Sequence, residues 1–223
     1  MNTDIFKKPM SLIVSLYANE TNLVQAAWDN GADIVKVHMN VEHRASGTVF
    51  GDFEAEKNFF AETIANKRGS VGIVAGGDIE SVQRDYEKAA NAGFDFVSLY
   101  AQHMPARFLA NKRMAHAMAI DNNFPVELIP HIPSDILEVA IINPAGYGEP
   151  LNAQDIAEYR AVASKTNLPM VVPTQRKILT SDIIQLQEIG FAAVMIGAVV
   201  TGKDIETLKA SVSSFRNAID KLM

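Results

Sequence analysis

The chain has 223 residues, of which 48% are hydrophobic and 21% are charged. These proportions are ordinary for a globular protein, so collagen-like, low-complexity and disordered architectures are excluded. The chain has no cysteine and a net charge of −6, which excludes disulfides and thiolate metal sites and argues against a general nucleic-acid-binding surface.

The chain is expected to form a single domain over residues 1–223. No shift in composition divides it, and its length suits one large α/β domain that buries its core without disulfides. The segment 1–10 has no apolar stretch of signal length, and no run approaches the roughly 18 apolar residues of a membrane span. A cytoplasmic protein without membrane or nucleic-acid partners is therefore expected.

Eight short apolar segments alternate with segments that have the amphipathic spacing of helices. The expected strands are Ser11–Ala18, Asp33–Asn40, Val71–Asp78, Phe94–Gln102, Phe124–His131, Val139–Asn143, Met170–Thr174 and Ala192–Ile196. The expected helices are Thr21–Asn30, Phe53–Asn66, Ile79–Ala92, Pro105–Ile120, Ala153–Lys165, Ser181–Glu188 and Ile205–Met223. This alternation predicts an α/β protein with a single (β/α)8 TIM barrel. A doubly wound parallel sheet, which more often has about five or six strands, is the alternative.

One expected unit of the barrel is irregular. Only about seven residues separate His131 from Val139, fewer than the dozen or so that a crossover helix normally needs. Either the helix after the fifth strand is shortened to a single turn, or residues 134–142 form the helix and the expected sixth strand is misplaced.

The alternation of polar and apolar residues predicts which side chains point into the barrel. On the second expected strand, Lys36, His38 and Asn40 share one face, and the apolar residues between them share the other. Inward positions near the ends of other strands are also polar: Ser15, Tyr17, Ser98, Tyr100, Gln102, Glu127 and His131. Because TIM barrels carry their active sites at the carboxyl ends of the strands, this pattern predicts a polar site there.

Lys36 is the most informative of these residues. A lysine inside a barrel is unfavourable unless a carboxylate pairs with it or it takes part in binding or chemistry. Glu127, expected on the fifth strand, is the candidate partner. Lys36 is therefore predicted to form that ion pair, to bind or act on a substrate, or to do both.

Four histidines lie at or just after expected strand ends: His38, His43, His103 and His131. His116 falls within an expected helix and is interpreted as a surface residue. Together with Asp78, the four could form a divalent-metal site, but no close metal-ligand spacing is present. No cofactor is therefore expected, with a divalent metal ion as the alternative; recognition of phosphate or hydroxyl groups, or proton transfer by an imidazole, is preferred.

The segment 41–52, between the second expected strand and its helix, is long for a barrel loop and contains His43 and Arg44. Long loops at this end of a barrel often close over a substrate. The segment is interpreted as a lid or substrate clamp, with a mobile surface loop as the alternative.

A phosphate site is expected after the last two strands. The eighth expected strand ends at Ile196 and runs through Gly197 into a short helix, and the amides of such a turn can bind an anion. Arg176, Lys177 and Lys203 would supply positive charge, although a plain strand-to-helix turn is the alternative. The residues expected at this site are Thr174, Gln175, Arg176, Lys177, Gly197, Ala198 and Thr201.

Four short motifs are spread over most of the chain: LIVS at 12–15, GADIVK at 31–36, AGYG at 145–148 and GAVVT at 197–201. Together they resemble the ribulose-phosphate-binding barrel superfamily, and within it most closely the N-acetylmannosamine 6-phosphate epimerases. The resemblance implies a barrel that binds a small phosphorylated substrate between the loops after its seventh and eighth strands.

The chain departs from these epimerases at their reacting residues. Where they have a lysine at the end of strand three, this chain has AGGD at 75–78, and where they have a glutamate after strand seven it has PTQ at 173–175. Tyr17 stands in place of their glutamine on strand one, and Lys36 in place of their arginine on strand two. The resemblance therefore does not carry the epimerase reaction over to this chain.

These observations favour an isomerase, epimerase or lyase that acts on a small phosphorylated sugar or sugar acid. The expected catalytic residues are Lys36, His38, Asp78, Glu127 and His131. The expected substrate-binding residues are Ser15, Tyr17, Asn40, Arg44, Tyr100 and Gln102. The alternatives are a Schiff-base aldolase that uses Lys36 and a non-catalytic barrel that binds a phosphorylated metabolite. A homodimer is expected only because symmetric oligomers are common.

Overall fold

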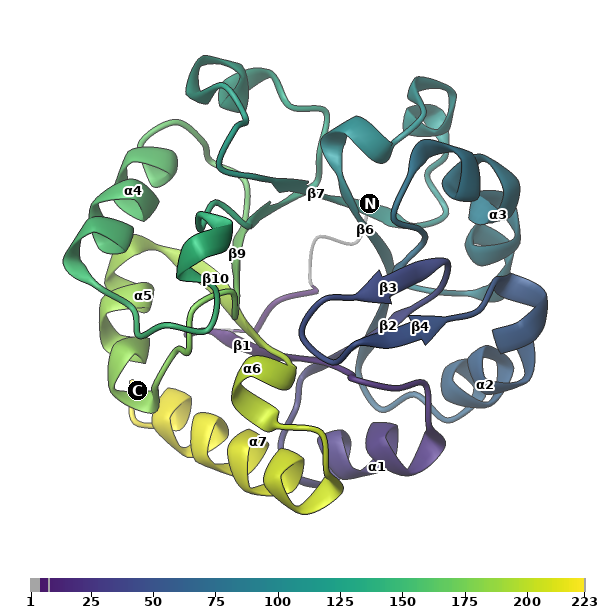
Figure 1. Ribbon diagram of the computed structural model, residues 1–223, viewed down its shortest axis with the longest axis horizontal. Coiled ribbons are helices and arrows are strands. Elements are labelled where there is room, and N and C mark those ends of the chain that lie inside the picture. The colour runs from purple at the N-terminus through teal and green to yellow at the C-terminus, as the bar shows by residue number, and fades with distance from the viewer. Residues whose placement is uncertain (1–4, 8, 223) are drawn as a thin grey trace.

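Eight parallel strands close into a barrel, as the alternation predicts (Figure 1). The computed structural model describes residues 5–7 and 9–222. Around the barrel the strands follow the order β1-β10-β9-β8-β7-β6-β5-β2. Their bounds are β1 Ser11–Ser15, β2 Ile34–His38, β5 Ser70–Val74, β6 Phe96–Tyr100, β7 Ala115–Ile120, β8 Ile136–Val139, β9 Met170–Pro173 and β10 Phe191–Ile196. The predicted (β/α)8 TIM barrel is confirmed.

The helices form an outer ring around the strands (Figure 1). Their bounds are α1 Thr21–Asp29, α2 Phe53–Ala65, α3 Ile79–Ala92, α4 Ala153–Ala163, α5 Ile183–Ile189, α6 Ala198–Thr201 and α7 Ile205–Asp220. Side-chain caps begin several of them: Asp52 accepts a hydrogen bond from the Ala55 amide, and Asp204 accepts from the amides of Glu206 and Thr207. Such caps satisfy amides that have no partner within the helix, so the helices start close to where the sequence predicts them.

Two successive crossovers lack an α-helix and contain short 3-10 helices instead. These are η1 Ala101–His103 and η2 Ala106–Ala110 after β6, and η3 Val126–His131 after β7. The predicted helix 105–120 is therefore wrong, because its second half is strand β7. The predicted strand 124–131 is also wrong, because Pro125 precedes η3 and Pro130 lies within it, and proline donates no hydrogen bond to a sheet ladder.

The short spacing between His131 and Val139 has a simple cause: the fifth barrel strand lies at 115–120 and not at 124–131. The prediction of a shortened helix after the fifth strand is confirmed, since the crossover from β7 to β8 carries only η3. The alternative of a helix over 134–142 is wrong, because β8 occupies residues 136–139. The expected sixth strand began three residues too late.

Apolar side chains fill two separate layers. One lies between the strands and the surrounding helices, and the other fills the interior of the barrel with one residue or more from nearly every strand: Ile13, Ile34, Phe96, Ala117, Ile136, Val171, Ala193 and Met195. Ile5 and Phe6, which precede β1, pack against the interior layer. The interior is therefore a packed core that supports the polar side chains nearer the carboxyl ends of the strands.

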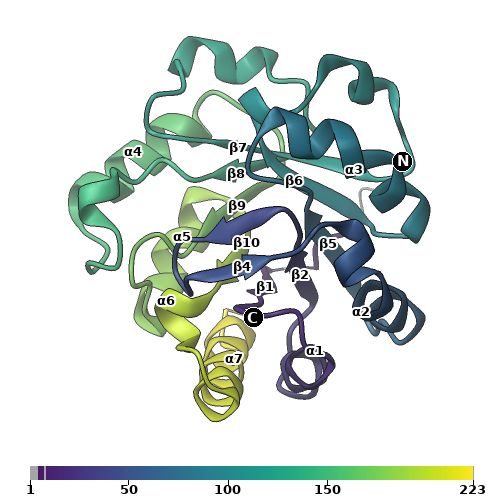
Figure 2. The ribbon, with the colours of Figure 1, turned by 45° about the vertical axis from the view of Figure 1, so that its right-hand side comes forward.

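A two-stranded hairpin, β3 Val41–His43 and β4 Thr48–Phe50, follows β2 and lies across the mouth of the barrel (Figures 1 and 2). Asn40 has a φ of 53° and turns the chain from β2 into the hairpin. The Thr48 hydroxyl donates to the Tyr17 carbonyl at 2.7 Å, and the Gly77 amide donates to the Asn40 carbonyl at 3.0 Å. Residues 41–50 of the segment 41–52 thus form a hairpin that contacts the barrel.

Candidate functional site

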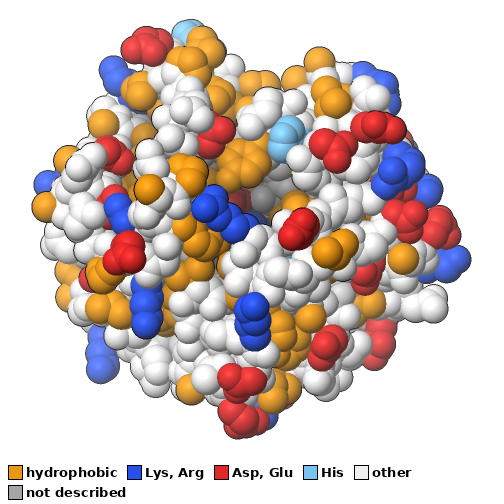
Figure 3. Space-filling view, viewed as in Figure 1, with side chains coloured by type: hydrophobic (Ala, Val, Ile, Leu, Met, Phe, Trp, Pro, Cys, Tyr) orange, Lys and Arg blue, Asp and Glu red, His pale blue; other side chains and the backbone are white. Residues whose placement is uncertain are grey.

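A cavity of about 350 Å³ opens at the carboxyl ends of the barrel strands. Figure 3 shows the hollow at the centre of this face, with basic and imidazole side chains at its edge. Polar side chains from the strand ends, from the hairpin and from the loops beside them line it: Ser15, Lys36, His38, Glu42, His43, Arg44, Ser98, Tyr100, His103, Glu138, Tyr147, Thr174 and Gln175. The predicted polar site at this end of the barrel therefore corresponds to a real concavity.

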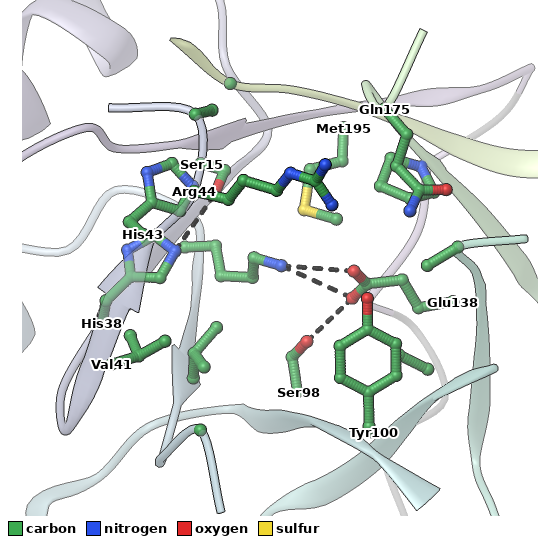
Figure 4. Close-up of a pocket in the computed structure, with 18 of the residues that line it drawn as sticks. Ser15, His38, Val41, His43, Arg44, Ser98, Tyr100, Glu138, Gln175 and Met195 are labelled. Carbon is green, nitrogen blue, oxygen red and sulfur yellow. Dashed lines mark hydrogen bonds and ion pairs between the residues drawn. The ribbon is translucent and has the colours of Figure 1, made fainter. Parts of the chain in front are cut away.

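A buried ion pair crosses the barrel within this cavity (Figure 4). Lys36 Nζ lies 3.4 Å from Oε2 and 3.5 Å from Oε1 of Glu138, and the Ser98 hydroxyl donates to Oε2 at 2.7 Å. Both charged residues are less than a tenth exposed. In the closed barrel, three strands separate β2 from β8 in either direction, so Lys36 and Glu138 approach one another from opposite walls.

The predicted partner of Lys36 was wrong. Glu127 and His131 lie on η3, outside the barrel strands, and both are exposed. Glu138 takes the place that was assigned to Glu127, because the fifth strand is β7 and the sixth begins at Ile136. One signal in the sequence pointed to Glu138: it is the single charged residue within the apolar run 136–142.

His38 lies beside the ion pair and is buried. Its Nε2 is 3.3 Å from the Ser15 hydroxyl, and its ring stacks on Phe50 at 4.8 Å between centroids. Burial, the neighbouring His43 and the charge of Lys36 together hold the pKa of His38 well below its usual value near 6.5. His38 is therefore a neutral imidazole at neutral pH.

His43 reaches the cavity from the hairpin. Its Nδ1 is 2.8 Å from the Ser46 hydroxyl, and its ring centroid lies 4.8 Å from that of His38. Burial and the charge of Lys36 lower the pKa of His43 to about 4. The two adjacent imidazoles thus contribute no positive charge to the cavity at neutral pH.

Arg44 extends from the hairpin across the mouth of the cavity. Its Nη2 donates to the Pro144 carbonyl at 3.3 Å, and its guanidinium lies 4.8 Å from the centre of the Tyr147 ring. Tyr100 also lines the cavity. Its burial, and to a smaller extent the negative charge of Glu138, raise its pKa to about 12. Tyr100 therefore offers a protonated hydroxyl to the cavity.

Several residues expected at the substrate lie outside the cavity lining. Asp78 is exposed and caps α3 by accepting from the Ser81 amide at 2.8 Å. Asn40 donates to Asp85 at 3.0 Å and joins the hairpin to α3. Gln102 is exposed on η1, and Tyr17 is half-buried against the outer apolar layer. The prediction extended the inward–outward alternation of the strands beyond the ends of β1, β2, β5 and β6. The backbone leaves the strand direction at those ends, so these side chains do not line the cavity.

The residues expected to bind phosphate divide into two groups. Thr174, Gln175, Gly197 and Ala198 line the cavity, whereas Arg176, Lys177 and Thr201 do not. The Gly197 amide donates to the Thr174 hydroxyl at 3.0 Å, and α6 has only four residues. The Gly197 amide, which was expected to face an anion, thus already has a hydrogen-bond acceptor within the protein.

None of the three cations expected to bind phosphate, Arg176, Lys177 and Lys203, lines the cavity, and Lys203 is exposed. Arg176 forms a salt bridge of 2.9 Å with the buried Asp155 and donates to the Gly146 carbonyl at 2.7 Å. Lys177 is exposed, and its amide donates to the Glu149 carbonyl at 2.9 Å. Arg176 therefore joins the β9 loop to α4 and to the loop after β8.

His116 corrects another expectation. It lies on β7, is 2% exposed and shares a 2.9 Å hydrogen bond with the Tyr86 hydroxyl, so its interpretation as a surface residue is wrong.

Over residues 5–7 and 9–222, no group of three or more His, Cys, Asp or Glu side chains has the arrangement of a metal site. Within the same residues, no helix has the length and apolarity needed to cross a bilayer.

The fold and the polar mouth define the class of protein as a (β/α)8 barrel with a charged cavity at the carboxyl ends of its strands. No protein-family profile matches the chain, and no curated protein sequence matches it. Solved structures with the same fold do match. The tryptophan synthase A-subunit of Pyrococcus furiosus superposes with a TM-score of 0.72 at 13% identity, over 95% of this chain and 99% of that one.

Two further structures are similar. Thiamine phosphate pyrophosphorylase of Pyrococcus furiosus has a TM-score of 0.65 at 12% identity, with 96% of this chain and 97% of that chain covered. Tryptophan synthase of M. tuberculosis has a TM-score of 0.66 at 14% identity, with 94% and 92% covered. At such identities the likeness establishes the fold, and function has to be argued from the site.

Proposed function

We propose that this barrel is an enzyme that acts on a small phosphorylated sugar or sugar acid, as an isomerase, an epimerase or a lyase. The observation that carries the proposal is the arrangement of Lys36, Glu138 and Ser98 in the cavity, with Lys36 Nζ 3.4 Å from the carboxylate. A buried charge pair is costly to desolvate, and this one lies in a cleft that a ligand can enter. The cavity also suits a small metabolite in size.

The pair is suited to moving a proton next to a carbonyl group. The Glu138 carboxylate takes the proton from the carbon beside the carbonyl, and the electron pair of that C–H bond forms an enolate. The Lys36 ammonium stabilises the negative enolate oxygen, and the Ser98 hydroxyl orients Glu138 through its 2.7 Å hydrogen bond. An epimer forms when a second acid, water in the cavity, delivers a proton to the opposite face and Glu138 releases its own proton to solvent. An isomer forms when Glu138 returns its proton to the former carbonyl carbon, while the hydroxyl proton on the carbon that it deprotonated moves to the enolate oxygen.

The phosphate of the substrate is proposed to lie at the mouth, near the loops after β9 and β10. Thr174, Gln175 and Ala198 line the cavity on that side. Three considerations support a phosphorylated substrate: the motifs shared with N-acetylmannosamine 6-phosphate epimerases, the cationic groups at the cavity, and a structural neighbour that by its name handles thiamine phosphate. The particular epimerase reaction is a finer proposal that rests on the shared motifs alone.

The proposal is tested with a panel of sugar phosphates and phosphorylated sugar acids, assayed for turnover and for exchange of carbon-bound protons with deuterium from solvent. On a substrate found in this way, Lys36→Met and Glu138→Gln are expected to lower kcat by about a hundredfold or more. Lys165→Met, at an exposed lysine, is the control and keeps full activity. Unchanged turnover in either cavity variant would remove that residue from the mechanism.

A Schiff-base aldolase is the second candidate, and the position of Lys36 Nζ favours it. The amine lies in the cavity, and Glu138 lies close enough to take the proton that a nucleophilic amine must lose. Carbonyl substrates added with borohydride would then leave a reduced adduct on Lys36, detected by mass spectrometry. The absence of an adduct on Lys36 with a substrate that the enzyme turns over would eliminate this mechanism.

A non-catalytic barrel that binds a phosphorylated metabolite is the third candidate. Gly76 and Gly77 line the cavity after β5, where the resembled epimerases carry their lysine. Thermal-shift measurements with the same panel identify ligands. A ligand that stabilises the protein in that measurement, with neither turnover nor proton exchange, would favour this candidate over the enzyme.

A further inference from the structure

Two contacts cross the barrel along one diameter, at different depths. The deeper one is the Lys36–Glu138 ion pair, between β2 and β8. The outer one joins the hairpin that follows β2 to the loop that follows β8, where Arg44 donates to the Pro144 carbonyl and covers the Tyr147 ring. The cavity is lined by both sets of residues. A ligand in it therefore lies between Lys36 on the inner side and Arg44 on the outer side.

Arg44 and Lys36 are the arginine and the lysine among the described residues that line the cavity. His38 and His43 are neutral at neutral pH, because burial lowers the pKa of both. Lys36 is already paired with Glu138. Arg44 has no carboxylate within salt-bridge distance among the described residues, so its charge is available to a ligand.

The geometry of Arg44 also leaves donors free. A guanidinium has five N–H groups in a planar fork, and Arg44 uses one of them in a long hydrogen bond of 3.3 Å to a backbone carbonyl. The Tyr147 ring lies against the guanidinium at 4.8 Å, which holds its plane without occupying its N–H groups. Arg44 is exposed at the mouth and can be reached by a ligand that enters from solvent.

We propose that Arg44 is the residue that binds the phosphate of the ligand, in place of Arg176 and Lys177, and that Tyr147 positions its guanidinium. This inference rests on the proposed function in one respect, the phosphorylated ligand. The planar guanidinium of an arginine can donate two parallel hydrogen bonds to the oxygens of one phosphate. The hairpin then serves two purposes, since it covers the ligand and supplies the charge that distinguishes a phosphorylated sugar from a neutral one.

The test measures binding of inorganic phosphate to the full chain by isothermal titration calorimetry. Arg44→Gln is expected to weaken binding by about tenfold or more, the effect of losing one charge-assisted hydrogen bond. Arg44→Lys should retain part of the affinity, because it keeps the charge and loses the fork. Arg113→Gln is the matched control: Arg113 is an exposed arginine paired with Glu87 at the surface, and its replacement should leave the affinity unchanged.

Tyr147 is tested as a positioning residue with two variants. Tyr147→Phe keeps the ring and should keep the phosphate affinity, whereas Tyr147→Ala should lower it about threefold to tenfold, as expected for loss of a cation–π contact. Equal affinity of wild type and Arg44→Gln for phosphate would overturn the inference. Absence of phosphate binding to the wild type at tens of millimolar would overturn it as well.

The two proposals fail in distinguishable ways. If the sugar-phosphate panel gives no turnover but phosphate binding still depends on Arg44, the enzyme proposal fails and the Arg44 inference stands. If turnover requires Lys36 and Glu138 but Arg44→Gln changes neither KM nor phosphate affinity, the Arg44 inference fails alone.

Discussion

Lys36 is stabilised by a carboxylate that lies 102 residues further along the chain. The pair is less than a tenth exposed at each residue, and the Ser98 hydroxyl satisfies a further lone pair of Glu138. Desolvation of two charges is unfavourable and is offset only when they stay paired and hydrogen-bonded. The pair is therefore expected to add little net stability, in keeping with the role that we propose for it in the cavity.

Removing one partner of this pair should destabilise the fold more than removing both. Glu138→Leu leaves the Lys36 charge without its partner and is expected to lower the free energy of unfolding by about 3 kcal/mol, whereas Lys36→Met with Glu138→Leu should recover most of the loss. Urea denaturation measures the free energy of unfolding of the single and the double variant. Glu87→Leu, which breaks the exposed pair with Arg113, is the control and should change stability by less than about 1 kcal/mol. A double variant as unstable as Glu138→Leu would contradict the expectation.

Buried histidines make the stability of the fold depend on pH. The pKa values of His38, His43 and His116 are all lowered, chiefly by burial, with that of His43 at about 4. Between pH 6.5 and about 4 the unfolded chain binds more protons than the folded chain at these residues. Their contribution to stability is therefore fully present above pH 6.5 and is lost as the pH falls toward 4.

The urea midpoint should accordingly be constant from pH 8 to 7 and fall steadily below pH 6.5. His43→Asn should make this decline shallower, because one group that takes up a proton on unfolding has been removed. His131→Asn is the matched control, since His131 is exposed on η3, and it should decline as the wild type does. Equal slopes in His43→Asn and wild type would show that His43 is not buried as a neutral imidazole.

At the scale of elements, the β3–β4 hairpin decides how the cavity is covered. Only three residues in each strand pair with one another, and so short a hairpin is not stable by itself. Contacts outside the hairpin hold it: the Thr48 hydroxyl donates to the Tyr17 carbonyl at 2.7 Å, and the Gly77 amide donates to the Asn40 carbonyl at 3.0 Å. Within the hairpin, the Thr48 hydroxyl also accepts from Ser46 at 2.9 Å. Loss of these contacts should free the hairpin without unfolding the barrel.

Thr48→Val keeps the shape of the side chain and removes its hydrogen bonds. It is expected to weaken hairpin docking by about 1 kcal/mol, and therefore to speed trypsin cleavage after Arg44 by about fivefold while the global unfolding midpoint changes little. Val49→Thr is the control on the same hairpin, because Val49 is 76% exposed. A cleavage rate in Thr48→Val no faster than in the control would show that other contacts hold the hairpin.

At the scale of the whole molecule, the interior of the barrel is filled in layers. Gly72 on β5 pairs in register with Lys36 on one side and Phe96 on the other. A Cβ at Gly72 would overlap the Phe96 ring, so the glycine makes the room that this ring occupies in the interior apolar layer. Phe96 thereby helps to form the packed support under the polar cavity.

Gly72→Ala should therefore overpack the barrel and cost about 1–3 kcal/mol of unfolding free energy. Adding Phe96→Leu should recover part of this loss, so that the double variant is more stable than the sum of the single effects predicts. Gly77→Ala is the control, since a Cβ there meets its nearest neighbour at an ordinary 3.6 Å. Simple additivity of Gly72→Ala and Phe96→Leu would show that the two residues do not share this space.

The helix and strand predictions that were wrong in kind lie in one region, 105–131. The alanine-rich segment 115–120 has helical propensity, yet it forms β7. There the small side chain of Ala117 fits the barrel interior, and that of Ala119 lines the cavity above it. Residues 124–131 have apolar residues typical of a strand, but their prolines place them in η3. In the first case the requirement to close an eight-stranded barrel overrode local preference. In the second the prolines were themselves a local signal against a strand.

The sequence by itself determined the barrel, the polar inward faces at the strand ends and the position of Lys36 in the cavity, because strand alternation and helix capping act between near neighbours in the chain. Only the tertiary structure decided that Glu138 pairs with Lys36, that Arg176 binds Asp155, and that Arg44 spans the mouth. Those contacts join opposite walls or separate loops of a closed barrel, and barrel closure sets their distances.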